Sequence, residues 1–151
     1  MGEKQVRDQP EGDGLQAFTR HVLHDLRALE QIITEGMIES DVQRIGAEQE
    51  LFLVHRNWRP ALKAYAMLEA LDDPQFTTEL GLFNLECNLK PRILGGSCLA
   101  EMEAELNGLV DKAREAAVAQ GLEVVLIGIL PTLRKSDLGM ESMTPEPRYY
   151  A

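Results

Sequence analysis

Apolar residues recur at steps of three and four in two long segments, and this spacing is typical of one buried helix face. The first segment runs from about Leu15 to Met37. The second follows Gly95 and Gly96, with Ser97 as the expected N-cap and Gly121 as the expected C-terminal cap. The two stripes consist of Leu15, Phe18, Val22, Leu26, Leu29 and Ile33, and of Leu99, Met102, Leu106, Leu109, Ala113 and Ala117. Two long helices are therefore predicted.

Three other segments are predicted to be strands. The first runs from about Arg44 to His55, and the second from about Leu82 to Leu89. The third, residues 122–130, is almost continuously apolar, which predicts a central strand buried on both faces. Between the first two strands, Pro60 is well placed to open a short helix.

The first two predicted strands each place carboxylates on one face. Successive side chains of a strand point to opposite faces, so Glu48 and Glu50 share a face. In the second strand, Asn84, Glu86 and Asn88 share one face. Its other face is predicted to carry Phe83, Leu85, Cys87 and Leu89. Both strands therefore have an apolar back and an acidic front.

This order of elements predicts an α+β fold, with a mainly antiparallel or mixed sheet and long helices on one face. The other face of the sheet is expected to carry the carboxylates. The chain has 151 residues, which is enough for one domain with a core. Residues 1–14 are polar and are predicted to be a flexible tail, so that the domain comprises residues 15–151.

The net charge of −10 argues against two classes of binding partner. Binding to nucleic acid or anionic lipid is driven by lysine and arginine, so neither partner is expected. No segment approaches the roughly 20 apolar residues of a membrane span. The two cysteines, Cys87 and Cys98, lie outside any metal-binding spacing, so we expect a reducing, cytoplasmic location.

Two interpretations of the acidic front are open. A glutamate pair on a strand face is most often a solvated outer surface. If the two fronts align in one sheet, however, Glu48, Glu50 and Glu86 converge, and like charges repel unless a cation lies between them. This arrangement favours a divalent metal site.

Four blocks along the chain resemble a known family. The run from Ile45 to Val54 resembles the GxExE strand that opens the catalytic domain of glutamate-cysteine ligases of the second bacterial type and their carboxylate-amine ligase relatives. Residues 79–91 are similar to the family's next acidic strand. Residues 128–133 and 143–150 look like its following block, which ends in an arginine-tyrosine pair. The resemblance covers residues 44–151.

The resemblance implies ATP-dependent amide formation on a glutamine-synthetase-like sheet. A carboxylate substrate, glutamate in the family's name, takes the terminal phosphoryl group of ATP, and an amine such as cysteine then displaces phosphate. By the same resemblance, Glu48, Glu50 and Glu86 are ligands of Mg²⁺ or Mn²⁺, and Arg148 is a catalytic residue that contacts phosphate or carboxylate. ATP-binding residues other than these are not identified.

The chain ends at Ala151, where the family's catalytic domain continues with a histidine-containing strand. We therefore expect residues 15–151 to be the N-terminal portion of that domain, truncated at its C-terminus and inactive alone. The missing part of the same domain, or a second copy in a homo-oligomer, would be its partner. The alternative is a non-catalytic binding or assembly module that uses its exposed sheet.

Overall fold

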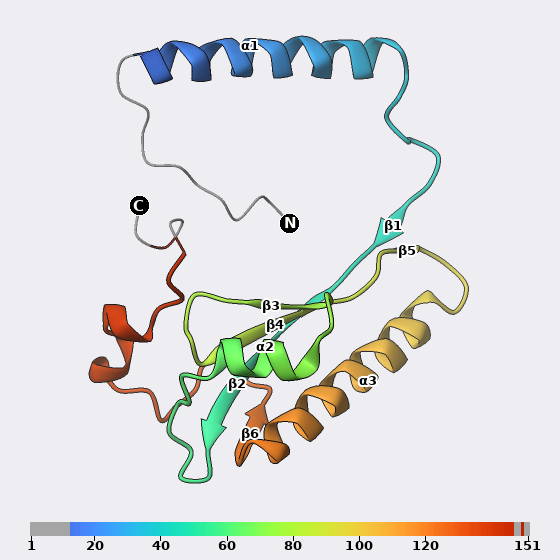
Figure 1. Cartoon of the computed structure of the whole chain (residues 1–151). Coiled ribbons are helices and arrows are strands. Elements are labelled where there is room, and N and C mark those ends of the chain that lie inside the picture. The colour runs from blue at the N-terminus through green and yellow to red at the C-terminus, as the bar shows by residue number, and fades with distance from the viewer. Residues whose placement is uncertain (1–12, 147–148, 150–151) are drawn as a thin grey trace. The chain divides into compact units, whose positions relative to one another are not determined.

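The computed structural model describes residues 13–146 and 149 (Figure 1). The chain divides into two compact units, of which one contains helix α1 and the other spans Arg44–Pro145. Helix α1, Asp13–Thr34, confirms the first predicted helix. Residues 1–12 of the predicted tail lie outside the described part of the chain. No helix among the described residues is long and apolar enough to cross a membrane.

The unit Arg44–Pro145 is built on a four-stranded antiparallel sheet. Strands β2 (Glu48–His55), β3 (Phe76–Thr78), β4 (Asn84–Asn88) and β6 (Leu122–Val125) lie in the order β3-β4-β2-β6. The short strands β1 (Arg44–Ile45) and β5 (Arg92–Ile93) pair separately. The predicted α+β class with a mainly antiparallel sheet is confirmed, although β1 and β2 are two strands where one was predicted.

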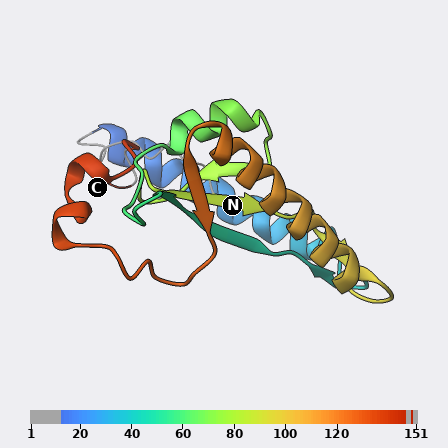
Figure 2. The same ribbon diagram turned by 90° about the horizontal axis from the view of Figure 1, so that it is seen from below.

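Two helices cover one face of this sheet (Figure 2). They are α2 (Ala64–Leu71) and α3 (Cys98–Ala119). Alternate strand residues such as Leu51, Leu53 and Leu85 point toward them and are fully buried. Ala113 and Ala117 of α3 pack against these leucines in the same core, as the predicted stripe requires. Gly121, with φ +71°, ends α3 as expected.

A smaller core lies on the opposite face of the sheet. Phe52, Val54, Phe83 and Leu130 are buried there, and the rings of Phe52 and Phe83 stack with centroids 6.3 Å apart. The segment after β6, with the 3-10 helices η1 (Lys135–Leu138) and η2 (Met140–Ser142), passes over this face (Figure 2). The prediction that Phe83 shares a face with Leu85 is wrong, because Phe83 lies in the turn before β4.

Two other predictions about strands and helices are wrong. Residues 122–130 do not form a central strand: β6 ends at Val125, lies at the edge of the sheet, and is followed by exposed Ile127 and Ile129. Pro60 does not open a helix, because it forms a bridge with Val54 that extends the backbone. Helix α2 begins only at Ala64.

Candidate functional site

The sheet register brings the predicted acidic residues to one face. Glu50 of β2 lies directly opposite Glu86 of β4, and Glu48 lies opposite Asn88. Residues that face each other across antiparallel strands project to the same side of the sheet. Glu48, Glu50 and Glu86 therefore share the face that α2 and α3 leave uncovered. We call these three residues, together with Asn88, the acidic face.

The electrostatic environment of Glu50 is unfavourable for its charged form. Its carboxyl group is partly desolvated, which raises its pKa, and the Glu79 and Glu86 carboxylates raise the pKa further. Glu79 follows β3 and thus joins the acidic face from a third segment. Among the described residues, no lysine or arginine forms an ion pair with Glu48, Glu50 or Glu86.

Asn88 holds one of these carboxylates in place. Its side-chain Nδ2 donates a hydrogen bond of 2.7 Å to Glu86 Oε1. Its Oδ1 is buried and accepts no hydrogen bond within the described structure. A buried amide oxygen without a donor carries a desolvation cost that a cation or another donor would offset. The acidic face therefore contains an oxygen acceptor besides its carboxylates.

The chemistry of these donors fits a hard divalent cation. Carboxylate and amide oxygens are the ligands that Mg²⁺ and Mn²⁺ prefer. Within residues 13–146 and 149, no three His, Cys, Asp or Glu side chains already lie in an arrangement that could hold a metal ion. A cation bound between Glu50 and Glu86 would offset the mutual repulsion of their carboxylates.

A cavity of about 410 Å³ adjoins Glu50. It lies between the sheet, the turn before β4 and the segment that follows β6. Most of its lining is apolar, and its polar side chains are Glu50, Glu79 and Asn84. The apolar side chains that line it are Phe52, Leu80, Phe83, Ile129, Leu133, Leu138 and Met143.

Gly81 is required where the cavity meets the sheet. A Cβ atom at this position would lie 2.8 Å from the Phe83 ring and 3.0 Å from Asn84 Oδ1. Distances this short force a side chain to move. Gly81 also pairs with Met143 in an isolated bridge, which joins the turn to the segment after β6. The close approach of these backbones depends on glycine.

An ion pair anchors the outer wall of the cavity. The Arg59 guanidinium donates to both oxygens of Asp137, at 2.6 Å each, and also to the Thr132 carbonyl. Hydrogen bonds from the Arg134 backbone N–H and from Arg59 hold the pKa of Asp137 below its ordinary value. Asp137 lies in η1 next to Leu138, so Arg59 ties the cavity wall to the loop after β2.

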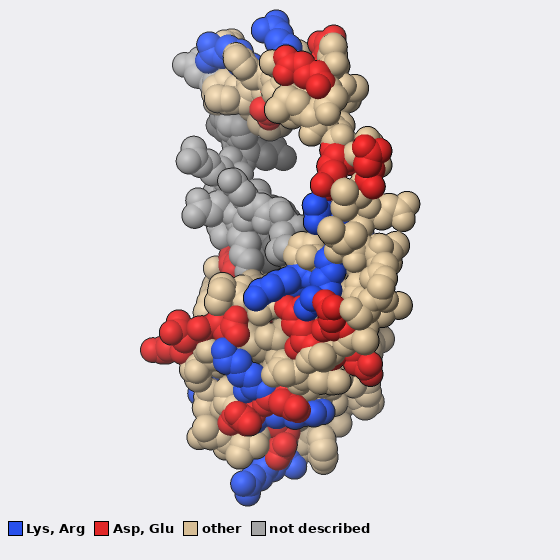
Figure 3. Space-filling model, turned by 90° about the vertical axis from the view of Figure 1, so that its right-hand side faces the viewer, with Lys and Arg blue, Asp and Glu red and all other residues tan. Residues whose placement is uncertain are grey.

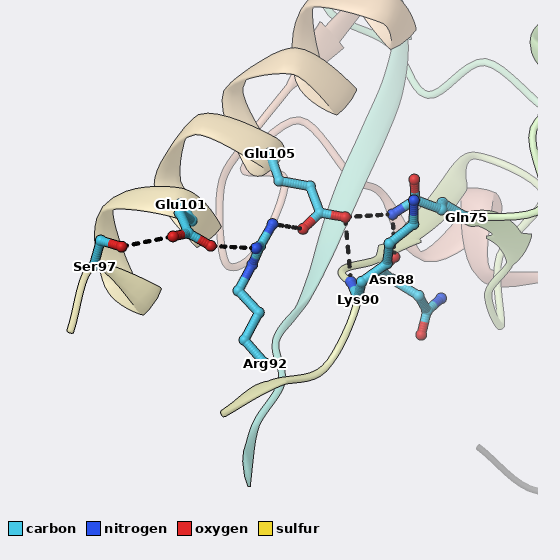
Figure 4. Close-up of polar contacts among 7 residues, drawn as sticks. All are labelled: Gln75, Asn88, Lys90, Arg92, Ser97, Glu101 and Glu105. Atoms are coloured by element: carbon cyan, nitrogen blue, oxygen red, sulfur yellow. Dashed lines mark hydrogen bonds and ion pairs between the residues drawn. The ribbon is translucent and has the colours of Figure 1, made fainter. Parts of the chain in front are cut away.

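A polar network behind the acidic face links β4 to helix α3 (Figure 4). Gln75 Nε2 donates to the Asn88 carbonyl and to Glu105 Oε1, at 3.0 and 2.9 Å. Arg92 then bridges Glu105 and Glu101, at 2.9 and 2.6 Å. Burial of Glu105 raises its pKa, but hydrogen bonds from Gln75, the Lys90 N–H and Arg92 outweigh this effect and hold the pKa below its ordinary value.

Charge pairing distinguishes this network from the acidic face. On the side of the Arg44–Pro145 unit that Figure 3 shows, acidic and basic side chains lie next to one another. Two ion pairs of this unit are those of Arg92 with Glu105 and of Lys112 with Asp73. Ser97 precedes α3 as predicted, but its hydroxyl donates to Glu101 and does not cap the helix backbone. Glu48, Glu50 and Glu86 have no such ion pair with any lysine or arginine that the structure describes.

Sequence reasoning located all four residues of the acidic face and missed the cavity beside it. Glu79, Phe83 and Leu133 belong to segments that periodicity does not relate to one another. The signal in the sequence that could have indicated the cavity was the position of Gly81 and Phe83, just before the acidic strand β4. Arg148, the predicted catalytic residue, lies outside the described residues.

Comparison with known proteins identifies the family. The model of glutamate-cysteine ligase family 2 matches residues 44–151. This is a family of ATP-dependent carboxylate-amine ligases, which generally use a divalent metal and act on small amino-acid substrates. No curated protein and no solved structure matches the chain. Because the matched residues make up most of its length, the chain belongs to glutamate-cysteine ligase family 2.

Proposed function

We propose that this chain serves ATP-dependent ligation of glutamate to an amine in the cytoplasm. In the first step, a carboxylate oxygen of glutamate attacks the terminal phosphorus of ATP, which yields an acyl phosphate and ADP. In the second step, the amine nitrogen attacks the acyl carbon. The carbon–oxygen bond to phosphate breaks, phosphate leaves, and the nitrogen loses a proton as the amide forms. Small-molecule substrates rather than macromolecules are the partners.

The observation that supports this proposal most is that Glu50 and Glu86 lie opposite each other and form no ion pair with any of the described lysines and arginines. Glu48, Glu50 and Glu86 would hold Mg²⁺ or Mn²⁺, and Asn88 Oδ1 supplies a further oxygen. A metal ion held by these residues would neutralise charge on the ATP phosphates. Glutamates at alternate strand positions lie about 6 to 7 Å apart, a spacing that suits paired metal ions.

The chain's own residues have two further tasks in this scheme. Asn88 orients Glu86 through its hydrogen bond, so that one carboxylate is positioned before any ligand arrives. Arg148 would contact phosphate or carboxylate, as the family resemblance implies.

Calorimetric titration of the whole chain with ATP tests the proposal. With Mg²⁺ present, ATP should bind measurably, and without a divalent cation it should bind at least tenfold more weakly, because the acidic face repels phosphates. Glu86→Gln should abolish the dependence on Mg²⁺. Glu103→Gln, on an exposed position of α3, is the matched control and should leave it intact. ATP binding that is absent, or equal with and without Mg²⁺, would contradict the ligase.

One observation favours the alternative of an assembly module. Strand β6 is an edge strand, and the apolar residues that follow it, Leu126, Ile127 and Ile129, are exposed. Such an edge is a template for strand pairing with a second copy. Sedimentation at several protein concentrations measures this association. Association together with a failure of the ATP titration would establish the module as the better description.

A further inference from the structure

One glutamine holds the end of strand β4 by two hydrogen bonds. Asn88 is the last residue of β4, and the register of β3 with β4 places Gln75, the residue before β3, opposite it. The Asn88 N–H donates to the Gln75 carbonyl at 2.7 Å. In an antiparallel ladder the Gln75 N–H would return this bond, but it donates to Asp73 Oδ1. The Gln75 side chain takes its place, because Nε2 donates to the Asn88 carbonyl at 3.0 Å.

The surroundings of this side chain require an amide nitrogen. Gln75 Nε2 also donates to Glu105 Oε1 of α3, at 2.9 Å (Figure 4). A backbone carbonyl and a carboxylate both accept hydrogen bonds and cannot donate them. The two hydrogens of Nε2 match these two acceptors, whereas a carboxylate side chain at the same position would have no hydrogen for either. The site therefore selects glutamine by its chemistry as well as by its size.

Asn88 carries this restraint to the acidic face. The backbone of a strand sets the direction in which each side chain leaves it, so bonds that fix the Asn88 backbone also fix the origin of its side chain. The Asn88 Nδ2 donates to Glu86 Oε1 at 2.7 Å, and hydrogen bonds to a carboxylate are among the stronger ones in proteins. A chain of hydrogen bonds thus runs from Gln75 through Asn88 to Glu86.

We propose that Gln75 is a positioning residue for Glu86 and that it acts through Asn88. Without the bond from Gln75 Nε2, the end of β4 loses a restraint, and the Asn88 amide no longer holds the Glu86 carboxylate in one orientation. Residues that orient metal ligands typically change metal affinity by about 10- to 100-fold when they are replaced. The inference rests on the proposed function only where it takes the ligand of Glu86 to be a divalent cation.

Titration of the whole chain with Mn²⁺ alone, in which electron paramagnetic resonance measures the free ion, tests the inference. Gln75→Met keeps the length of the side chain, removes its donor and should weaken Mn²⁺ binding about tenfold. Gln75→Glu should also weaken binding, although its added negative charge by itself would strengthen the binding of a cation. Unchanged affinity in Gln75→Met, or higher affinity in Gln75→Glu, would overturn the proposal.

A matched control lies at the C-terminal end of α3. Gln120 Nε2 also donates to a backbone carbonyl, that of Ala66, and Gln120→Met removes the same kind of bond away from the acidic face. This variant should bind Mn²⁺ as the parent chain does. An equal loss of affinity in Gln120→Met would overturn the assignment to Gln75. Thermal unfolding followed by circular dichroism confirms that each variant is folded at the temperature of the titration.

A double-mutant cycle tests whether Gln75 acts through Asn88. Asn88→Ala should weaken Mn²⁺ binding by at least about tenfold, and Gln75→Met added to it should cause less than about a twofold further loss. A general structural defect would instead add its own loss, so the double variant would bind about 100-fold more weakly than the parent chain. Such additivity would overturn the route through Asn88.

A measurement without metal separates this inference from the proposed function. The side-chain amide signals of Asn88 in the ¹⁵N–¹H NMR spectrum, identified by their absence from Asn88→Ala, should shift in Gln75→Met and stay in place in Gln120→Met. A shift without Mn²⁺ binding by the parent chain would retain the positioning of Glu86 and contradict the proposed metal site. Mn²⁺ binding with an unmoved Asn88 signal would retain the metal site and overturn the role of Gln75.

Discussion

Replacing Glu50 with glutamine tests whether the acidic face is repulsive, which is the premise of its role as a cation site. Glutamine keeps the size of the side chain and removes its charge. Partial burial, and after it the Glu79 and Glu86 carboxylates, oppose the charged form of Glu50 and raise its pKa. The variant should therefore be more stable than the parent chain at pH 7.

The expected gain in the stability of Glu50→Gln follows from the strand register. Glu50 and Glu86 lie directly opposite, so their Cβ atoms are about 5 Å apart. Two carboxylates about 6 Å apart in a water-like dielectric repel by about 0.7 kcal/mol, and physiological salt reduces this to about 0.3 kcal/mol. Glu79 adds a similar amount, so the total is about 0.7 kcal/mol. That corresponds to a rise of about 2 °C in Tm for a chain of this length.

The sign of the pH dependence is fixed by the raised pKa. The folded chain keeps the Glu50 proton at pH values above the ordinary 4.5, where the unfolded chain has lost it. Stability conferred by that proton is therefore lost as pH rises from 4.5 through the folded pKa. In Glu50→Gln this loss is absent. The gain in Tm should thus be full at pH 7 and should vanish at about pH 3.5, where the carboxyl is protonated in both states.

Thermal unfolding followed by circular dichroism, across this pH range, measures the effect. Glu103→Gln removes one charge from an exposed position of α3 and is the control. Glu50→Gln that is no more stable than Glu103→Gln at pH 7 would refute the repulsion. A gain of equal size at pH 3.5 would show that packing, not charge, is responsible.

Three further substitutions have expected outcomes. Glu105→Gln should destabilise the chain by about 1 to 2 kcal/mol in urea at pH 7, because it weakens the ion pair with Arg92, and the loss should shrink as pH falls through the lowered pKa of Glu105. Leu85→Ala should cost about 3 kcal/mol in the same assay, since its side chain is fully buried. Arg59→Ala should lower the midpoint of urea unfolding, because Asp137 would lose its anchor; an unchanged midpoint would show that the cavity wall does not depend on this ion pair.

Local patterns along the sequence were sufficient for the two long helices and for the acidic side of each strand. The stripe from Leu106 to Ala117 predicts α3 because helical spacing is a property of neighbouring residues. Alternation likewise places Glu48 and Glu50 on one side of β2 without knowledge of any partner strand. The four family-like blocks added the chemistry that these patterns alone leave undecided.

Only the tertiary structure decided how those elements meet. The pairing of Glu50 with Glu86 depends on register, and register is set by packing between strands that lie far apart in sequence. Apolar content predicted burial for residues 122–130, but burial requires a partner, and β6 has one only on the β2 side. The tertiary structure also decided that Glu79 and Leu133 line the same cavity. These residues lie in segments far apart in sequence, and contact between such segments leaves no local periodicity in the sequence.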